Sequence, residues 1–585
     1  MNARLDSDYR AEALNALGDS EIDVLVIGGG VVGAGAALDA AARGLSVTMV
    51  EARDFAAGTS SRSSKLIHGG LRYLEQLDFW LVREALKERK LLLHKLAPHL
   101  VRPVSFLLPL QHRVWERAYI GAGVALYDTM GGARAVPMHR HVSRSRALEL
   151  GPALREDAMI GAIRYFDAQV DDARHTMTIA RTAARHGATV LTRTKVTGLL
   201  REGMSGQGPE AAACVTTQGP ELMPDEHRGR VVGAQVTDVE TGREYTVRAR
   251  SVISATGVWT DEMNRMTGVD FPFHVRMSKG VHIMVPRERL DLDTGLAMRT
   301  EKSILFVIPW HQHWIIGTTD TDWELDKNHP SASHTDIRYI LDHVNSILRE
   351  PLTEDDIVGT YAGLRPLLAG AKDSDTTKLS REHAVAEPVP GLFVIAGGKY
   401  TTYRVMAADV VDAAVRDFGT AVAPSVTEHL PLVGAVGYQE LAADVPGVAH
   451  RCGLPAETVE HLLGRYGSGI ADLLALIEAN PELAQPIPGA EEYVGAEAVY
   501  AATHEGALHL DDVLTRRTRI SIEFADRGVE AAAHIAHLIA GPLGWDAETT
   551  EGEIARYRGR VEAELAANKA VTDEAANAAR LIAVA

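Results

Sequence analysis

Three glycines and one acidic residue near the N-terminus have the spacing that a dinucleotide-binding turn requires. Gly28, Gly30 and Gly33 interrupt an apolar run, and an acidic side chain, Glu51, follows 18 residues later. In that spacing the first glycine makes a tight turn, the second lets backbone approach a pyrophosphate, and the third lets a helix pack against a strand. The acidic side chain can accept hydrogen bonds from ribose hydroxyls. The spacing does not choose between NAD and FAD.

The segments around these residues have the order of elements that positions such a turn. Residues 24–27 are an apolar run, the alanine-rich stretch that follows Gly33 contains no proline, and residues 46–50 form a second apolar run before the acidic residue. This order predicts a strand, a turn, a helix and a second strand, with the helix N-terminus facing the phosphates. Glycine-rich turns also serve ordinary strand-to-helix packing, so the whole unit, rather than the triplet alone, favours a cofactor site.

Composition limits the classes of protein to consider. At 585 residues, 46% of them hydrophobic, the chain is long enough for two or three domains. Its net charge of −18 argues against a general nucleic-acid binder. Two distant cysteines suggest neither a disulfide framework nor a cysteine-based zinc site, and we expect no metal. The N-terminus lacks the pattern of a secretory signal and no apolar run is long enough to span a bilayer, so we expect a cytoplasmic location.

The rest of the chain alternates between strand-rich and helix-rich stretches. Residues 77–100 have the spacing of an amphipathic surface helix, and a polar loop at 58–65 leads into a short helix at 66–74. From about residue 426 the pattern becomes helical. Residues 201–229 have the composition of a variable surface loop. Short apolar runs predict strands at 190–196, 231–236, 245–247, 252–257, 282–285, 304–309, 314–317 and 391–399.

One long segment resembles a known family. Residues 58–75, GTSSRSSKLIHGGLRYLE, closely resemble the signature of FAD-dependent glycerol-3-phosphate dehydrogenases. Further similar segments follow in order, so that the resemblance covers about residues 20–540; they are 255–259, 279–283, 316–320, 363–367, 397–404 and 509–519.

The resemblance implies an α/β fold. Its parts are a Rossmann-like, glutathione-reductase-like FAD-binding domain, an inserted β-rich substrate domain and a helical C-terminal domain. We expect the first and last parts of the FAD-binding domain at 20–100 and 356–425, with further FAD-binding and substrate-side elements at 101–270. The substrate domain is expected at 271–355 and the helical domain at 426–585.

The implied reaction is oxidation of sn-glycerol 3-phosphate to dihydroxyacetone phosphate, with noncovalent FAD as cofactor and membrane quinone as electron acceptor. Hydride transfer from C2 to flavin N5 requires a group that accepts the C2 hydroxyl proton and cations that hold a dianionic phosphate. Matching family positions place Arg72, Tyr73, Thr318 and Arg381 against the substrate. Guanidinium forks suit phosphate, although each arginine taken singly could be a surface residue.

Three residues are candidates for the chemical step. His282 lies on an apolar strand pattern, and the ordinary pKa range of histidine suits a proton acceptor near neutrality, although a core histidine bonded to backbone would fit the same pattern. Arg365 and Lys399 would stabilise the developing alkoxide and the reduced flavin. Hydrogen bonds that fix loops are the alternative role of both.

The cofactor would be surrounded by residues of two motifs besides the first glycine turn. The first motif supplies Thr59, Ser60, Ser61, Ser64, Lys65 and His68 around the pyrophosphate and the flavin edge. Backbone N–H groups of the second would face the flavin pyrimidine oxygen. These residues are Gly397, Gly398, Thr401 and Thr402, and Gly257 ends the strand at 252–257.

A quinone acceptor implies contact with a membrane surface. The basic amphipathic stretch 79–95 and the apolar stretch 115–127 are candidates, and both suit internal packing or a homodimer interface equally well. We therefore expect a homodimer in the cytoplasm or on the inner face of the cell membrane.

Three other readings keep the FAD fold. A glycerol-3-phosphate oxidase would pass electrons to oxygen, an amine or amino-acid oxidase would replace the phosphate-binding cations, and a non-catalytic FAD-binding protein would need no shared cavity. The C-terminal domain is assigned no chemistry. Its polar residues, His504, His509, Arg516 and Arg517, are expected on a solvated helix face.

Overall fold

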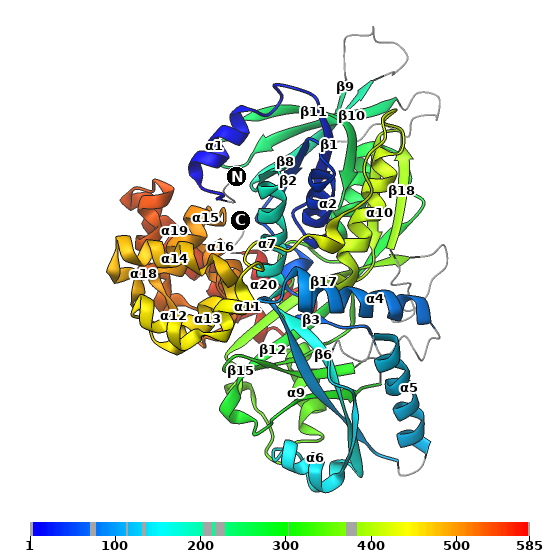
Figure 1. Cartoon of the computed structure of the whole chain (residues 1–585), viewed down its shortest axis with the longest axis vertical. Helices are drawn as coiled ribbons and strands as arrows, with labels where there is room; N and C mark the ends of the chain where they lie inside the picture. Colours follow the sequence, from blue (N-terminus) through cyan, green and yellow to red (C-terminus); the bar gives the residue numbers. More distant parts are fainter. Residues whose placement is uncertain are drawn as a thin grey trace.

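The computed structural model is shown in Figure 1. It describes residues 4–70, 78–112, 115–131, 136–202, 213–216, 229–301, 304–369 and 383–582. Two sheets lie one above the other in this view, and the C-terminal helices stand on one side of them. The helices α4 (Phe79–Leu91) and α5 (Trp115–Gly131) lie on the opposite side.

A parallel sheet with helices against it forms the first part of the fold. Five strands run parallel in the order β7-β2-β1-β11-β19, and β18 pairs antiparallel with β19. Apolar residues of α2, α7 and α10 pack together with those of the sheet in one core. The expected Rossmann-like unit is therefore present. Its elements are β1 (Ile22–Ile27), α2 (Val31–Ala42), β2 (Val47–Val50), α7 (Asp172–Arg185), β7 (Thr189–Leu191), β11 (Glu244–Ser254), β18 (His383–Val389), β19 (Leu392–Gly397) and α10 (Tyr403–Val415).

β11 differs from the sequence prediction because it is one continuous strand rather than two. Its first half pairs antiparallel with β10 (Arg230–Asp238), and its second half pairs in parallel with β1. The two short runs predicted at 245–247 and 252–257 are continuous because both halves are held by neighbours in one sheet. β10 continues to β8 (Thr194–Glu202) and β9 (Ala213–Thr216).

The second sheet carries most of the residues expected to do chemistry. Its order is β16-β12-β15-β14-β13-β4-β6-β3, with β17 on β12 and β5 on β6. β17 was expected in the FAD-binding domain, yet it pairs with β12 from His274 to Met284. Apolar residues of α6 (Arg144–Leu150) and α9 (His334–Asn345) share a core with this sheet. The strands are β3 (Leu66–Ile67), β4 (Val101–Leu110), β5 (Arg140–Ser143), β6 (Gly161–Val170), β12 (His274–Pro286), β13 (Gly295–Arg299), β14 (Ile304–Trp310), β15 (His313–Gly317), β16 (Thr321–Trp323) and β17 (Gly359–Ala369).

Two sequence predictions fail, one at β3 and one at α4. The short helix expected at 66–74 is wrong at its start, because Leu66 and Ile67 form β3 and pair with β6; residues 71–77 lie outside the described residues. The helix expected at 77–100 ends earlier, with α4 (Phe79–Leu91) followed by a π-helical turn (Leu92–Leu96). Its Leu81, Val82 and Leu86 pack against Tyr127 of α5 (Trp115–Gly131).

The C-terminal part is helical, as expected, but it also contains a short hairpin. The strands β20 (Pro486–Ile487) and β21 (Ala490–Val494) pair there. The helices of this part are α11 (Tyr438–Ala443), α12 (Val445–Cys452), α13 (Ala456–Tyr466), α14 (Ile470–Ala479), α15 (Gly495–His504), α16 (Leu510–Asp512), α17 (Ile520–Glu523), α18 (Val529–Leu543), α19 (Ala547–Lys569) and α20 (Asp573–Leu581). Elsewhere lie α1 (Ser7–Asn15) and α8 (Thr260–Thr267).

The prediction of a solvated helix face in this domain is wrong for its two arginines. Arg516 and Arg517 are buried and bind Asp54, which follows β2 in the FAD-binding part. Two of the bonds between Asp54 and Arg517 measure 2.7 Å. His504 is buried as well. The sequence suggested solvation because the partner carboxylate lies more than 460 positions away along the chain.

Gly33→Ala is expected to destabilise the protein. A Cβ atom at this position would lie 1.9 Å from the carbonyl oxygen of Gly28, so α2 would have to move away from β1. Overpacking of this kind costs about 1–3 kcal/mol, and the melting temperature should fall. Gly552→Ala in α19 is the control, since its Cβ would meet open space and alanine favours the helix. An unchanged melting temperature in Gly33→Ala would contradict the close packing.

Candidate cofactor and substrate site

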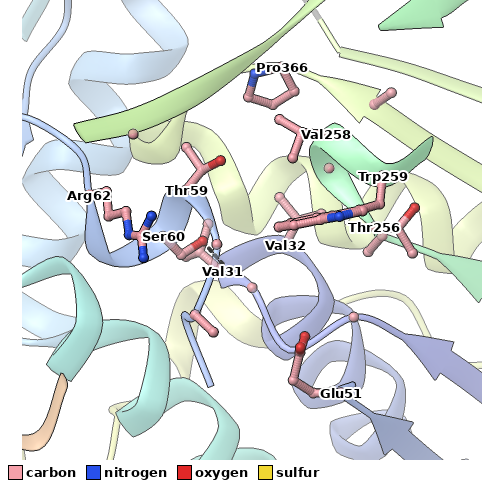
Figure 2. Close-up of a pocket in the computed structure, with 18 of the residues that line it drawn as sticks. Val31, Val32, Glu51, Thr59, Ser60, Arg62, Thr256, Val258, Trp259 and Pro366 are labelled. Carbon is pink, nitrogen blue, oxygen red and sulfur yellow. Dashed lines mark hydrogen bonds between the residues drawn. The ribbon is translucent and has the colours of Figure 1, made fainter. Parts of the chain in front are cut away.

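A cavity of about 1090 Å³ runs from the carboxyl ends of the parallel strands to the second sheet. Ligands of open α/β sheets bind at this edge. Gly28, Gly30 and Glu51 line one end of the cavity, and His282 and Arg365 line the other. Figure 2 shows Glu51 on one side, Thr59, Ser60 and Arg62 on a second side, and Thr256 and Trp259 opposite them. The cavity therefore joins the predicted nucleotide turn to the predicted chemical residues.

Backbone amides fix the carboxylate of Glu51 at the nucleotide end. Its Oε2 accepts from the N–H of Gly29 at 2.7 Å, and its Oε1 accepts from the N–H of Arg53 at 2.8 Å. Each oxygen keeps room for a second donor, because a carboxylate oxygen has two lone pairs. The side chain is thus held in place and can still accept from hydroxyls in the cavity.

The glycine turn brings the start of α2 close to the cavity. Gly28 has a φ of +112°, and a Cβ there would lie 2.7 Å from the carbonyl oxygen of Ala255. Gly30 is the N-cap of α2 and leaves backbone exposed to the cavity, while the Ser60 hydroxyl accepts from the N–H of Val31 at 3.0 Å. Gly33 lies behind the turn and lets the helix approach the strand. The turn therefore presents backbone N–H groups to an anion.

The serine-rich loop divides into cavity-facing and inward-facing residues. Thr59, Ser60 and Ser64 line the cavity. Lys65 instead points into the protein, where its ammonium group binds Asp172 at 2.7 Å with both side chains fully buried. The carbonyl of Ser61 accepts from the same ammonium group at 3.2 Å. These two residues hold the loop from behind, in contact with the protein rather than with the cavity.

A second turn closes the far end of the cavity. Gly397 and Gly398, with φ values of +76° and +80°, line it together with His68 and Lys399. The Thr401 hydroxyl bonds the backbone N–H and carbonyl of His68, both at 3.2 Å, and so ties the two motifs together. The Thr402 hydroxyl donates to the Lys399 carbonyl at 3.4 Å. Gly257, also lining the cavity, has a φ of +57°.

Arg365 is fixed by the strands of the second sheet. Its Nη2 donates to the Thr318 hydroxyl at 2.9 Å, and its Nη1 lies 3.5 Å from the carboxylate of Asp320. The side chain keeps 26% exposure, and it lines the cavity. Thr318 is buried and acts on the cavity through Arg365. The guanidinium is therefore positioned before any ligand arrives.

His282 lies next to Arg365 and is almost fully buried. Its Nε2 lies 2.8 Å from the Ser64 hydroxyl, and its ring stacks on Tyr361 with the ring centres 4.7 Å apart. Burial lowers the pKa of His282 well below 6.5, and the positive charges of Arg365 and Lys65 lower it further. The imidazole is therefore neutral at physiological pH.

Several expected residues cannot be placed, and several lining residues were missed. Arg72, Tyr73 and Arg381 lie outside the described residues. Trp259 lines the cavity with the guanidinium of Arg53 4.8 Å from its ring centre. The sequence could have identified the missed residues, because they lie in or next to the segments that resemble the family. The missed lining residues are Arg53, Arg62 and Trp259, and Asp320 was missed as the carboxylate beside Arg365.

Comparison with known proteins agrees with this geometry. Residues 23–412 match the FAD dependent oxidoreductase family, and residues 425–550 match the C-terminal domain of alpha-glycerophosphate oxidase. Glycerol-3-phosphate dehydrogenase 2 of Mycobacterium tuberculosis is 55% identical over 99% of this chain and 94% of that protein. The chain belongs to the FAD-dependent glycerol-3-phosphate dehydrogenase family.

More distant members of this family cover most of the chain as well. The mitochondrial glycerol-3-phosphate dehydrogenase of Homo sapiens is 37% identical over 92% of this chain and 72% of that protein. The crystal structure of glycerol-3-phosphate dehydrogenase from Bacillus halodurans, complexed with FAD, superposes with a TM-score of 0.74 at 27% identity. It covers 96% of this chain and 98% of that one. The expected α/β fold and the FAD cofactor are thus confirmed.

The cavity suits FAD on its own geometry. Its volume exceeds the roughly 300–1,000 Å³ typical of pockets for small ligands. The glycine turn offers backbone N–H groups where a pyrophosphate would lie, and Glu51 can accept from a ribose. At the far end, Gly397 and Gly398 offer a second backbone turn for the other half of the cofactor.

His282→Gln is expected to make the protein more tolerant of acid. The folded-state pKa of His282 is lowered, so below pH 6.5 the unfolded chain binds one more proton than the folded protein, and stability is lost as pH falls. Removing the imidazole removes up to about 1.4 kcal/mol of that loss per pH unit. As pH falls from 7.5 to 5, the temperature of the first melting transition of the variant should therefore rise relative to that of the wild type.

The matched control is His450→Gln, at an exposed position of α12. A constant difference in melting temperature between wild type and His282→Gln across this range would contradict the buried, neutral imidazole.

Proposed function

We propose that this chain oxidises sn-glycerol 3-phosphate to dihydroxyacetone phosphate. The observation that carries the proposal is that His282, Arg365 and Lys399 line the same cavity, which suits FAD. A non-catalytic FAD-binding protein would need no such convergence. The names of the relatives support the same substrate.

When bound, FAD would supply the acceptor for the C2 hydride and the route by which electrons reach the final acceptor. His282 is suited to receive the proton of the C2 hydroxyl, because it is neutral and its Nδ1 is buried with no hydrogen-bond partner among the described residues. A dianionic substrate nearby would raise the pKa of His282 by offsetting the charges of Arg365 and Lys65. Substrate binding itself would therefore make the imidazole a stronger base.

Cations complete the proposed site. Arg365, held by Thr318 and Asp320, would stabilise negative charge that develops on the C2 oxygen. Lys399 would add a second positive charge to the lining of the same cavity. From the resemblance, we propose Arg72, Tyr73 and Arg381 as further ligands of the substrate phosphate.

Anaerobic mixing with glycerol 3-phosphate tests this proposal. The flavin absorbance near its long-wavelength band should bleach in the wild type, and Arg365→Ala should lower the bleaching rate by about 10²–10³-fold, as loss of a charge-stabilising donor does. FAD content per chain is the control for folding. Bleaching of Arg365→Ala at the parental rate would contradict the role of Arg365, and no bleaching of the wild type would contradict the substrate.

Membrane quinone is the proposed electron acceptor, reached from the cytoplasmic side. Within the described ranges, the helices lack the combination of length and apolar character needed to cross a bilayer. An exposed apolar stripe on α5 supports surface attachment instead; it consists of Trp115, Ala118, Tyr119, Ala122 and Leu126. Next to α5, the exposed residues of α4 include Trp80 and the basic Arg83, Lys87 and Lys90.

Oxygen is the second candidate acceptor. The match of residues 425–550 to a domain of alpha-glycerophosphate oxidase favours it. The α5 stripe would then be explained by a homodimer, which we also propose as the alternative occupant of this surface. Adding either a quinone analogue or oxygen after anaerobic reduction separates the two acceptors.

Replacing Trp115 and Tyr119 together by serine is expected to weaken binding to vesicles of anionic phospholipid. The two side chains are 57% and 54% exposed, and each loses apolar area that would enter the lipid interface. Co-sedimentation should fall at least tenfold, with bleaching by substrate unchanged. Val436→Ser, at a position 71% exposed in the C-terminal part, is the control. Unchanged vesicle binding together with a loss of dimer in size-exclusion chromatography would assign the stripe to a dimer interface.

A further inference from the structure

A second, smaller cavity lies behind the serine-rich loop, against the C-terminal helices. Its volume is about 60 Å³, and five arginines line it: Arg62, Arg516, Arg519, Arg560 and Arg580. Glu564 is the single acidic residue in its described lining. Arg560 and Glu564 come from α19 and Arg580 from α20, while Arg62 comes from the loop that also borders the FAD cavity. The cavity therefore lies where the two parts of the chain meet.

Three of these arginines are neutralised by carboxylates. Arg516 binds Asp54 and Asp512, both at 2.5 Å. Arg519 binds Asp171 at 2.6 Å, and Arg560 binds Asp511 at 3.0 Å. Glu564 lies 3.7 Å from Arg560 and 3.9 Å from Arg527, so its single charge is already shared. These pairs leave no carboxylate in the cavity lining for the remaining two arginines.

Arg62 and Arg580 have no carboxylate within ion-pair distance among the described residues. Arg580 is 3% exposed, and its Nη1 is buried there without a hydrogen-bond partner. Burial and next the charge of nearby Arg560 lower the pKa of Arg580 to about 10, although the carboxylates of Glu564 and Asp511 act in the opposite direction. Burial likewise lowers the pKa of Arg62 to about 9, with several arginines adding to the shift. Two arginines, one half-buried and one buried, thus line the same small cavity without a direct ion-pair partner among the described residues.

The same excess of positive charge affects the imidazole of His329. It lines the cavity, and its Nδ1 is also buried without a partner among the described residues. Burial lowers its pKa to about 2, and the charges of Arg62 and Arg580 contribute next. A neutral imidazole keeps one N–H that can donate to a ligand.

Buried cations without counter-ions are costly, and an anion that enters the cavity would remove this cost. We propose that the cavity binds inorganic phosphate between Arg62 and Arg580. Guanidinium forks bind tetrahedral oxyanions through paired hydrogen bonds. A water molecule needs about 10–15 Å³ of such space, so 60 Å³ has room for the ion but not for an ester chain.

This site is separate from the substrate site. Arg580, Arg560 and His329 line the small cavity and do not belong to the described lining of the FAD cavity, whereas Arg62 borders both. The bound ion links α20 to the loop that carries Ser64, whose hydroxyl bonds His282. Phosphate therefore acts as a fixed counter-ion between the C-terminal helices and the loop beside the reacting groups.

Equilibrium dialysis of the full-length, FAD-loaded protein against radiolabelled phosphate tests the site. Saturating glycerol 3-phosphate is present under anaerobic conditions, so that phosphate cannot occupy the substrate site. The wild type should retain one phosphate per chain, and Arg580→Gln should bind it at least tenfold more weakly. Arg558→Gln, at an exposed position of the same helical pair, is the matched control and should bind as the wild type does.

The outcomes decide the proposal. No retained phosphate in the wild type, or equal retention in Arg580→Gln, overturns it. FAD content per chain verifies that the variant folds. If Arg580→Gln loses its FAD, Arg580→Lys replaces it, because lysine keeps the charge but not the fork; phosphate affinity equal to that of the wild type would then overturn the proposal. Substrate-dependent bleaching is measured separately, so failure of this site and failure of the proposed reaction are distinguishable.

Discussion

A single buried carboxylate, Asp172, connects the three regions on which the site depends. Its oxygens bind Lys65, the backbone N–H and hydroxyl of Ser63, and Arg519 of the C-terminal part. Its carbonyl accepts from the Tyr400 hydroxyl at 2.8 Å. Since a buried charge that loses its partners is strongly destabilising, the loop, the far turn and the C-terminal helices must all be in place together. The shape of the FAD cavity follows from this requirement.

Local patterns made part of this arrangement predictable. The glycine turn, α2 and Glu51 depend on neighbours within about 30 residues, so spacing alone locates them. The strands of the second sheet were also found where apolar runs were continuous. The resemblance supplied the residues that meet across larger distances, including His282 and Arg365.

The parts that could not be predicted depend on partners that are remote in sequence. The sequence predicts Lys65 as a loop cation that could face a phosphate. Its side chain instead points into the protein and binds Asp172, which lies 107 residues away along the chain. Thr318 was expected against the substrate, and it is bonded to Arg365, 47 residues later. Composition could not predict either pairing, because whether a polar side chain faces a ligand or another residue depends on the folded structure around it.

Charge is distributed unevenly between the protein as a whole and its interior. The chain carries a net charge of −18, yet arginines and lysines gather around the FAD cavity and the smaller cavity behind it. Both the cofactor and the proposed substrate are anions, so the interior is arranged to receive negative charge. The lowered pKa of His282 is one result of this excess.

The bond between Asp54 and Arg516 has a consequence for the order of events at the ribosome. The two residues are separated by 462 positions, and a ribosome adds about 5–20 residues per second. Asp54 is therefore synthesised roughly 20–90 s before its partner exists. During that interval the nascent nucleotide-binding part cannot bury Asp54 against its partner. The carboxylate must remain hydrated, or be covered by a chaperone, until the last helices emerge.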